Sequence, residues 1–103
     1  MLIGFTHGLV KAEQLPGIMA TDRPEDWGQT EERVWITGHV HHLSRKEYPG
    51  CTVETLRTIA SRDAWHAGKG YRSKQSLWAT TYDCEYGEDV RVTVPLRRAR
   101  EAA

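Results

Sequence analysis

The sequence lacks the features that mark several classes of protein. Among its 103 residues there are only two cysteines and one phenylalanine, and no apolar run approaches the roughly 18 residues that cross a membrane. The N-terminus has no basic region followed by a long apolar segment, so no signal peptide is expected. Lysine plus arginine and aspartate plus glutamate balance at 14 each, so no net charge attracts the chain to nucleic acid or to a membrane surface. We therefore expect a cytoplasmic protein without a membrane partner.

The proportions of hydrophobic and charged residues are typical of a small folded protein. Hydrophobic residues make up 39% of the chain and charged residues 27%, which fits a globular sequence and is enough for one modest core. We expect residues 1–103 to form a single α+β domain. The cysteines, Cys51 and Cys84, fall in different strand candidates. They are expected to be buried free thiols, and a disulfide or a metal role is the alternative.

Apolar and β-branched segments predict strands separated by turns. The expected strands are Leu2–Thr6, Arg33–Gly38, Cys51–Leu56, Ser76–Tyr86 and Asp89–Pro95, and the last two form a hairpin. In the last strand Val90, Val92 and Val94 alternate with polar residues, which predicts that the valine face is buried.

The remaining segments predict two helix starts and a loop. Lys11–Ala20 has helical composition, and Pro16 fits only a first turn, so the helix should begin near Gln14 or Leu15. Thr21–Pro24 is expected to be a turn or the start of a second helix. Arg45–Gly50 is expected to be a loop that ends in a Pro-Gly turn.

The most informative stretch is Val34–Ser44, which reads VWITGHVHHLS. Gly38 ends the apolar strand, and His39, His41 and His42 follow. In an extended backbone His39 and His41 point to the same side, while His42 points away. Imidazole is the commonest protein ligand for transition metals, so this pair predicts a metal site. The alternative is an exposed polar loop.

Two further features adjoin this stretch. His7 stands at the end of the strand Leu2–Thr6, and sites tend to be built at strand ends. Ser44, Arg45 and Tyr48 closely follow the histidines and could contact a substrate phosphate through charge-assisted hydrogen bonds. A solvated loop is the alternative for these residues. The sequence assigns no catalytic residue.

These elements together resemble the C-terminal part of the calcineurin-like metallophosphoesterases, and most of all members encoded by phages and prophages. The resemblance rests on the segments LIGFTHG, LPGIMATDRPEDWG, ITGHVHHLSRKEYPG and DAWHAGKGYRS and on the final hairpin. It implies part of a fold with two facing β-sheets and a dinuclear metal site at the strand ends. By this likeness His7 and His39 would bind one divalent transition metal, such as manganese, zinc or iron, and His41 the other.

Three ligand motifs of that family are missing. The chain has no Asp-x-His, no Gly-Asp pair and no Gly-Asn-His, so the carboxylate that would bridge two metals is absent. Holding two divalent cations close together requires anionic ligands, whereas three neutral histidines could hold one ion. The chain therefore resembles the C-terminal half of a phosphate-ester hydrolase, perhaps one acting on nucleic acid, and is expected to be inactive alone.

Two consequences follow for partners. Only a second chain with the missing motifs could supply the carboxylates, and the unpaired strands of a half-fold should also cause self-association. The alternative is a non-catalytic metal-binding or protein-interaction module, and a weaker third hypothesis is a mononuclear zinc hydrolase or sensor. The sequence leaves open whether the chain is an enzyme.

Overall fold

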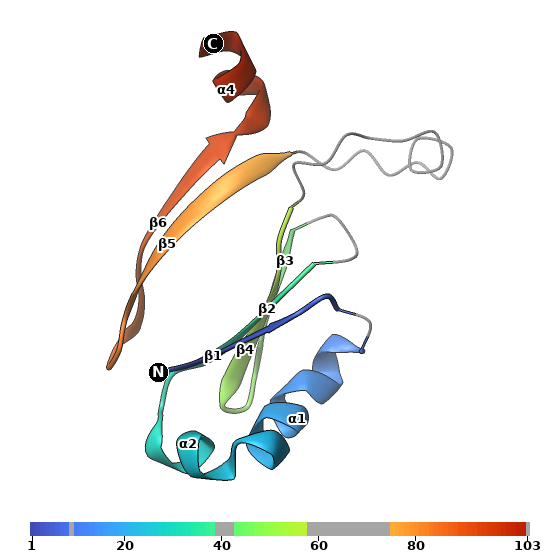
Figure 1. Cartoon of the computed structure of the whole chain (residues 1–103), viewed down its shortest axis with the longest axis vertical. Helices are drawn as coiled ribbons and strands as arrows, with labels where there is room; N and C mark the ends of the chain where they lie inside the picture. The colour runs from blue at the N-terminus through green and yellow to red at the C-terminus, as the bar shows by residue number, and fades with distance from the viewer. Residues whose placement is uncertain (9, 39–42, 58–74, 103) are drawn as a thin grey trace.

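The computed structural model describes residues 1–8, 10–38, 43–57 and 75–102. In this part of the chain two helices cover one face of a four-stranded mixed sheet, and a two-stranded hairpin crosses the other face (Figure 1). The α+β class, the short helices and the antiparallel hairpin agree with the prediction from the sequence. Within these residues no helix has the length and apolarity needed to cross a bilayer.

The N-terminal third of the chain is a parallel crossover. Strand β1 (Leu2–Thr6) leads through η1 (Ala12–Gln14), α1 (Leu15–Asp22) and α2 (Pro24–Gln29) to strand β2 (Arg33–Thr37). The two strands pair in parallel from Leu2 with Arg33 to Thr6 with Thr37. A parallel pair needs a connection that crosses the sheet, and the helices provide it.

Proline sets the helix boundaries. Pro16 lies in the first turn of α1, and Pro24 is the first residue of α2, where the missing N–H costs nothing. The predicted helix start near Leu15 is confirmed, and the Thr21–Pro24 segment does lead into a second helix.

The central sheet has the strand order β1-β2-β4-β3. Strand β4 (Cys51–Thr55) runs parallel to β2, and strand β3 (Ser44–Tyr48) is antiparallel to β4. The predicted loop at Arg45–Gly50 is therefore wrong, because most of it is an edge strand. The Pro-Gly turn is confirmed, and Gly50 has a φ of +80°, a conformation that favours glycine.

Most of the core lies between this sheet and α1. Among the described residues the buried apolar side chains there are Leu15, Met19, Cys51 and Val53, whereas Val34 pairs with Thr52 and so lies on the hairpin side of the sheet. The indole nitrogen of Trp35 donates a hydrogen bond to the carbonyl of Leu15 at 2.8 Å, which fixes the helix on the sheet. Cys51 is buried as predicted, but the prediction for Cys84 is wrong, because it lies exposed in the hairpin turn.

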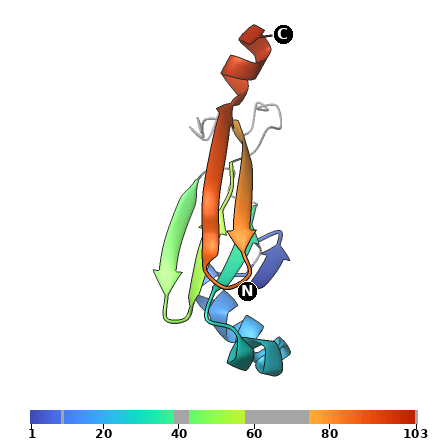
Figure 2. The same cartoon turned by 90° about the vertical axis from the view of Figure 1, so that its left-hand side faces the viewer.

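The hairpin consists of β5 (Ser76–Asp83) and β6 (Gly87–Pro95), and α4 (Leu96–Ala102) follows it. Figure 2 shows the hairpin in front of the sheet, with α4 extending beyond one end. The predicted burial of its valine face is wrong. Val90 and Val92 are each 53% exposed, because the opposite, polar face of the hairpin is the one that packs on the sheet.

Candidate functional site

The candidate site lies at the carboxyl ends of the three parallel strands. Strands β1, β2 and β4 run in one direction, so their ends meet at one edge of the sheet, the usual place for a site in parallel sheets. We call this the strand-end edge. It is formed by the residues that end or follow the three strands, from Thr6 to His7, from Thr37 to Gly38 and from Thr55 to Arg57.

Two of the segments implicated by the sequence begin side by side at this edge. Thr6 pairs with Thr37 in the β-ladder, so His7 and Gly38 are the next residues on adjacent strands. A Cβ atom on Gly38 would lie 3.8 Å from the carbonyl oxygen of His7. His7 is exposed at this point.

The other two predicted metal ligands, His39 and His41, lie outside the described residues. Among the residues that are described, no three metal-binding side chains form a cluster. The structure therefore brings His7 to the point where the histidine segment begins, and gives no coordination geometry for a metal.

The only fully buried carboxylate found in the described part of the chain is already neutralised. Glu54 is 1% exposed, and its Oε2 accepts a hydrogen bond from Nη2 of Arg91 at 2.8 Å. Its Oε1 contacts Nη1 of the same arginine as an ion pair without the alignment of a hydrogen bond. Glu54 is thus held by a cation, and a metal would have to displace that cation.

Arg91 joins a larger charged network between the hairpin and the sheet. It also contacts Glu88 at 2.5 Å, and Glu88 accepts a hydrogen bond from Arg45 at 3.0 Å. The guanidinium of Arg91 lies 4.5 Å from the ring centre of Trp78. The hydrogen bond with Glu54 raises the pKa of Arg91, with smaller contributions from the charges of Glu54 and Glu88.

The same network acts on two neighbouring groups. Burial alone would raise the pKa of Glu88, but the hydrogen bonds and charges of Arg45 and Arg91 outweigh it and lower that pKa. Burial, followed by the charge of Glu54, raises the pKa of Tyr82. At neutral pH Arg91 is therefore positively charged, Glu88 is negatively charged and the phenol of Tyr82 is neutral.

The sequence does not predict this network. The alternation of side chains in β4 could have identified one member, because it places Glu54 on the face opposite the buried Cys51 and Val53. Its partner Arg91 is 37 residues away, and nothing in the sequence pairs the two.

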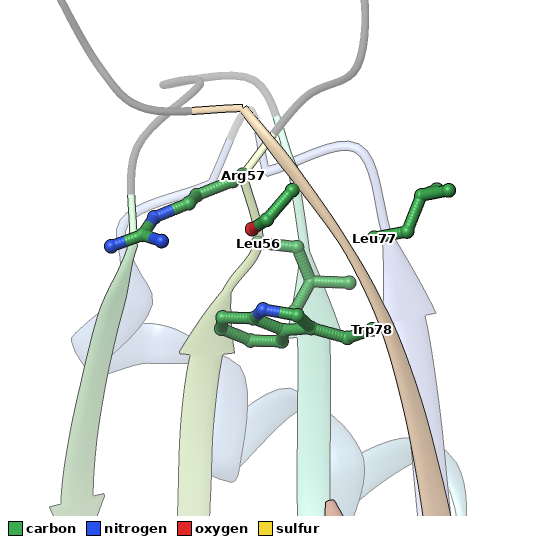
Figure 3. A pocket seen from close by; sticks show the side chains of 5 residues that line it. Leu56, Arg57, Leu77 and Trp78 are labelled. Carbon is green, nitrogen blue, oxygen red and sulfur yellow. The ribbon is translucent and has the colours of Figure 1, made fainter. Parts of the chain in front are cut away.

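A cavity of about 210 Å³ opens beside the strand-end edge (Figure 3). Its lining residues are Leu56, Arg57, Ser76, Leu77 and Trp78. The backbone N–H of Leu56 donates to the carbonyl of Thr37 at 3.0 Å, so the cavity adjoins the end of β2. Among the described residues, the hydroxyl of Ser76 and the indole nitrogen of Trp78 are buried without a hydrogen-bond partner.

The three predicted substrate-binding residues do not converge. All lie in β3, where alternation places Ser44 and Tyr48 on the helix-side face and Arg45 on the hairpin side. Ser44 pairs with Thr55 and so reaches the strand-end edge, whereas Tyr48 pairs with Cys51 at the opposite end of the ladder. Arg45 is engaged with Glu88. Of the three, Ser44 is the residue best placed for the candidate site.

We compared the chain with known protein families, curated proteins and solved structures. No family model matches the chain, and neither the curated proteins nor the solved structures contain a match.

Proposed function

We propose that this chain is the metal-binding C-terminal half of a calcineurin-like metallophosphoesterase, a phosphate-ester hydrolase that requires a complementing chain. The observation that carries the proposal is the placement of His7 beside Gly38 at the strand-end edge. The ligands that the motif resemblance names, His7, His39 and His41, belong to the segments that leave the sheet at this point.

The donor set fits one divalent transition metal better than two. Imidazole nitrogens suit zinc or iron, but they contribute no negative charge. The buried carboxylate of Glu54 is paired with Arg91. A bound ion would supply a Lewis acid that polarises a phosphoryl oxygen and lowers the pKa of a water molecule, while the histidines of this chain would hold and orient the ion.

The cavity beside the edge offers room for the organic part of a phosphate ester. Leu56 and Trp78 give it apolar walls, and Arg57 carries a positive charge at its rim. A substrate whose phosphoryl group lies at the histidines could place its leaving group there. This arrangement favours organic phosphate esters over free inorganic phosphate as the ligand.

A second candidate function is a non-catalytic metal-binding or protein-interaction module. The exposed apolar face of the hairpin favours the interaction module. It differs from the first in one respect: no complementing chain would restore hydrolysis.

Hydrolysis of bis-p-nitrophenyl phosphate in the presence of Mn²⁺ separates the two functions. We expect negligible turnover by the chain alone, and turnover after addition of a polypeptide that carries Asp-x-His, Gly-Asp and Gly-Asn-His motifs. His41→Ala should abolish the restored activity, whereas His42→Ala, whose side chain is predicted to point away, should retain it. Failure of every such polypeptide to restore turnover, with metal still bound, would favour the non-catalytic module.

A further inference from the structure

The outer face of the hairpin carries an apolar strip that nothing in the described structure covers. The β-ladder pairs Leu77 with Val94, Ala79 with Val92 and Thr81 with Val90, and these six side chains point to one side. All six are exposed, and the exposed fractions of the four larger ones range from 37% for Val94 to 53% for Val90 and Val92. We call this set the valine strip.

The strip is exposed because the hairpin attaches to the sheet by its other face. That face carries Trp78, Tyr82 and Arg91, and Arg91 forms the buried ion pair with Glu54. The protein thus buries a charged face of the hairpin and leaves an apolar one in water. Contiguous exposed apolar patches of this kind mark interaction sites more often than isolated exposed residues do.

The two ends of the strip carry opposite charges. At the turn end, Asp83, Glu85 and Asp89 are exposed, and at the other end helix α4 presents Arg97 and Arg98. In Figure 2 the hairpin runs between these ends, with its turn below and α4 above. No charged residue lies within the strip itself. A surface with this pattern is complementary to its own copy turned end for end.

We propose that the valine strip is a homodimer interface in which two copies pack face to face in antiparallel orientation. A two-fold axis through the Ala79–Val92 pair brings the strip of one copy onto that of the other. It also places the acidic turn of each copy against the basic helix α4 of its partner, as an isologous interface requires. The inference concerns a surface remote from the metal ligands and does not rest on the proposed function.

The size of the strip indicates how tightly the copies associate. The strip covers the five residues Val90–Val94 of β6 and their partners, about 17 Å by about 10 Å, so it buries on the order of 350 Å² over two copies, to which contacts of the charged ends add. Stable interfaces bury roughly 1,200 Å² or more, so the dimer should be weak and reversible.

Sedimentation velocity on the full chain tests the interface. Between low micromolar concentration and about 1 mM, where weak association becomes measurable, the wild type should shift from monomer toward dimer. Val92→Glu should weaken association at least tenfold, because it buries a charge at the centre of the strip. Val10→Glu is the matched control, since Val10 is an exposed valine outside the strip, and it should leave association unchanged. A wild type that stays monomeric, or a Val92→Glu variant that dimerises normally, would overturn the proposal.

Two further variants test the antiparallel orientation. Reversing α4 with Arg97→Glu and Arg98→Glu should weaken the dimer several-fold, and adding Glu85→Arg and Asp89→Arg should restore it. In a Cys84→Ser background, Val92→Cys should form an intermolecular disulfide because it lies near the axis, whereas Leu77→Cys should not. Cross-linking through Leu77→Cys in place of Val92→Cys would contradict this orientation.

Discussion

At the scale of single residues, the pair of Glu54 and Arg91 decides how the hairpin sits on the sheet. Glu54 is 1% exposed, and the side chain of Arg91 is 21% exposed. Ionised groups in such surroundings are tolerated only when each has a partner. The pair therefore helps to hold the hairpin on the sheet. Removing only one member should lower the free energy of unfolding more than removing both.

Arg91→Gln should destabilise the protein by about 3 kcal/mol, because it leaves the Glu54 carboxylate buried without its counter-charge. Urea denaturation followed by tryptophan fluorescence measures the change. The double variant Glu54→Gln with Arg91→Gln should recover part of the loss. Arg97→Gln, which removes an exposed ion pair with Glu101, is the matched control and should have little effect. A double variant that loses the sum of the two single effects would show that the residues do not act as a pair.

At the scale of elements, the sequence predicted those strands whose own residues carry the signal. Strands β1, β2 and β4 contain apolar or β-branched residues and end at glycine or polar positions, and all three are confirmed. Strand β3 has the sequence SRKEY, which contains no apolar alternation because it lies at a sheet edge with four of its five side chains exposed. The sequence also did not predict which face of the hairpin is buried. The polar face packs on the sheet through Arg91, and its partner Glu54 is 37 residues away in the chain.

Gly4 shows how closely β1 approaches its neighbour. A Cβ atom at this position would lie 2.6 Å from the ring of Trp35, and that ring is anchored by its hydrogen bond to Leu15. Gly4→Ala should therefore destabilise the protein by roughly 2 kcal/mol, the usual cost of overpacking. Gly17, inside α1, has nothing within 4 Å of an added Cβ, so Gly17→Ala should stabilise by roughly 0.5–1 kcal/mol.

Thermal unfolding of these two variants checks the packing of β1. The melting temperature should fall for Gly4→Ala and rise for Gly17→Ala. Equal shifts of the melting temperature in both variants would mean that the Trp35 ring does not limit the space at Gly4.

At the scale of the whole molecule, the parallel order of β1, β2 and β4 brings segments distant in sequence to one edge. The sequence identified His7 and the histidine segment as candidates from their positions at strand ends, and the register of β1 with β2 places those two ends side by side. The sequence could not identify the cavity or the charged network. Both depend on how the hairpin lies over the sheet, which is set by contacts between residues far apart in the chain.

The proposed function requires that His7, His39 and His41 together bind a metal. The most direct measurement is the metal content of the purified chain, determined by elemental analysis after equilibration with Zn²⁺ or Mn²⁺ and removal of excess ion. We predict about one ion per chain, as three imidazoles can hold, lost in His39→Ala and His41→Ala and retained in His42→Ala. A wild type without bound metal, or equal metal content in all four proteins, would contradict the account.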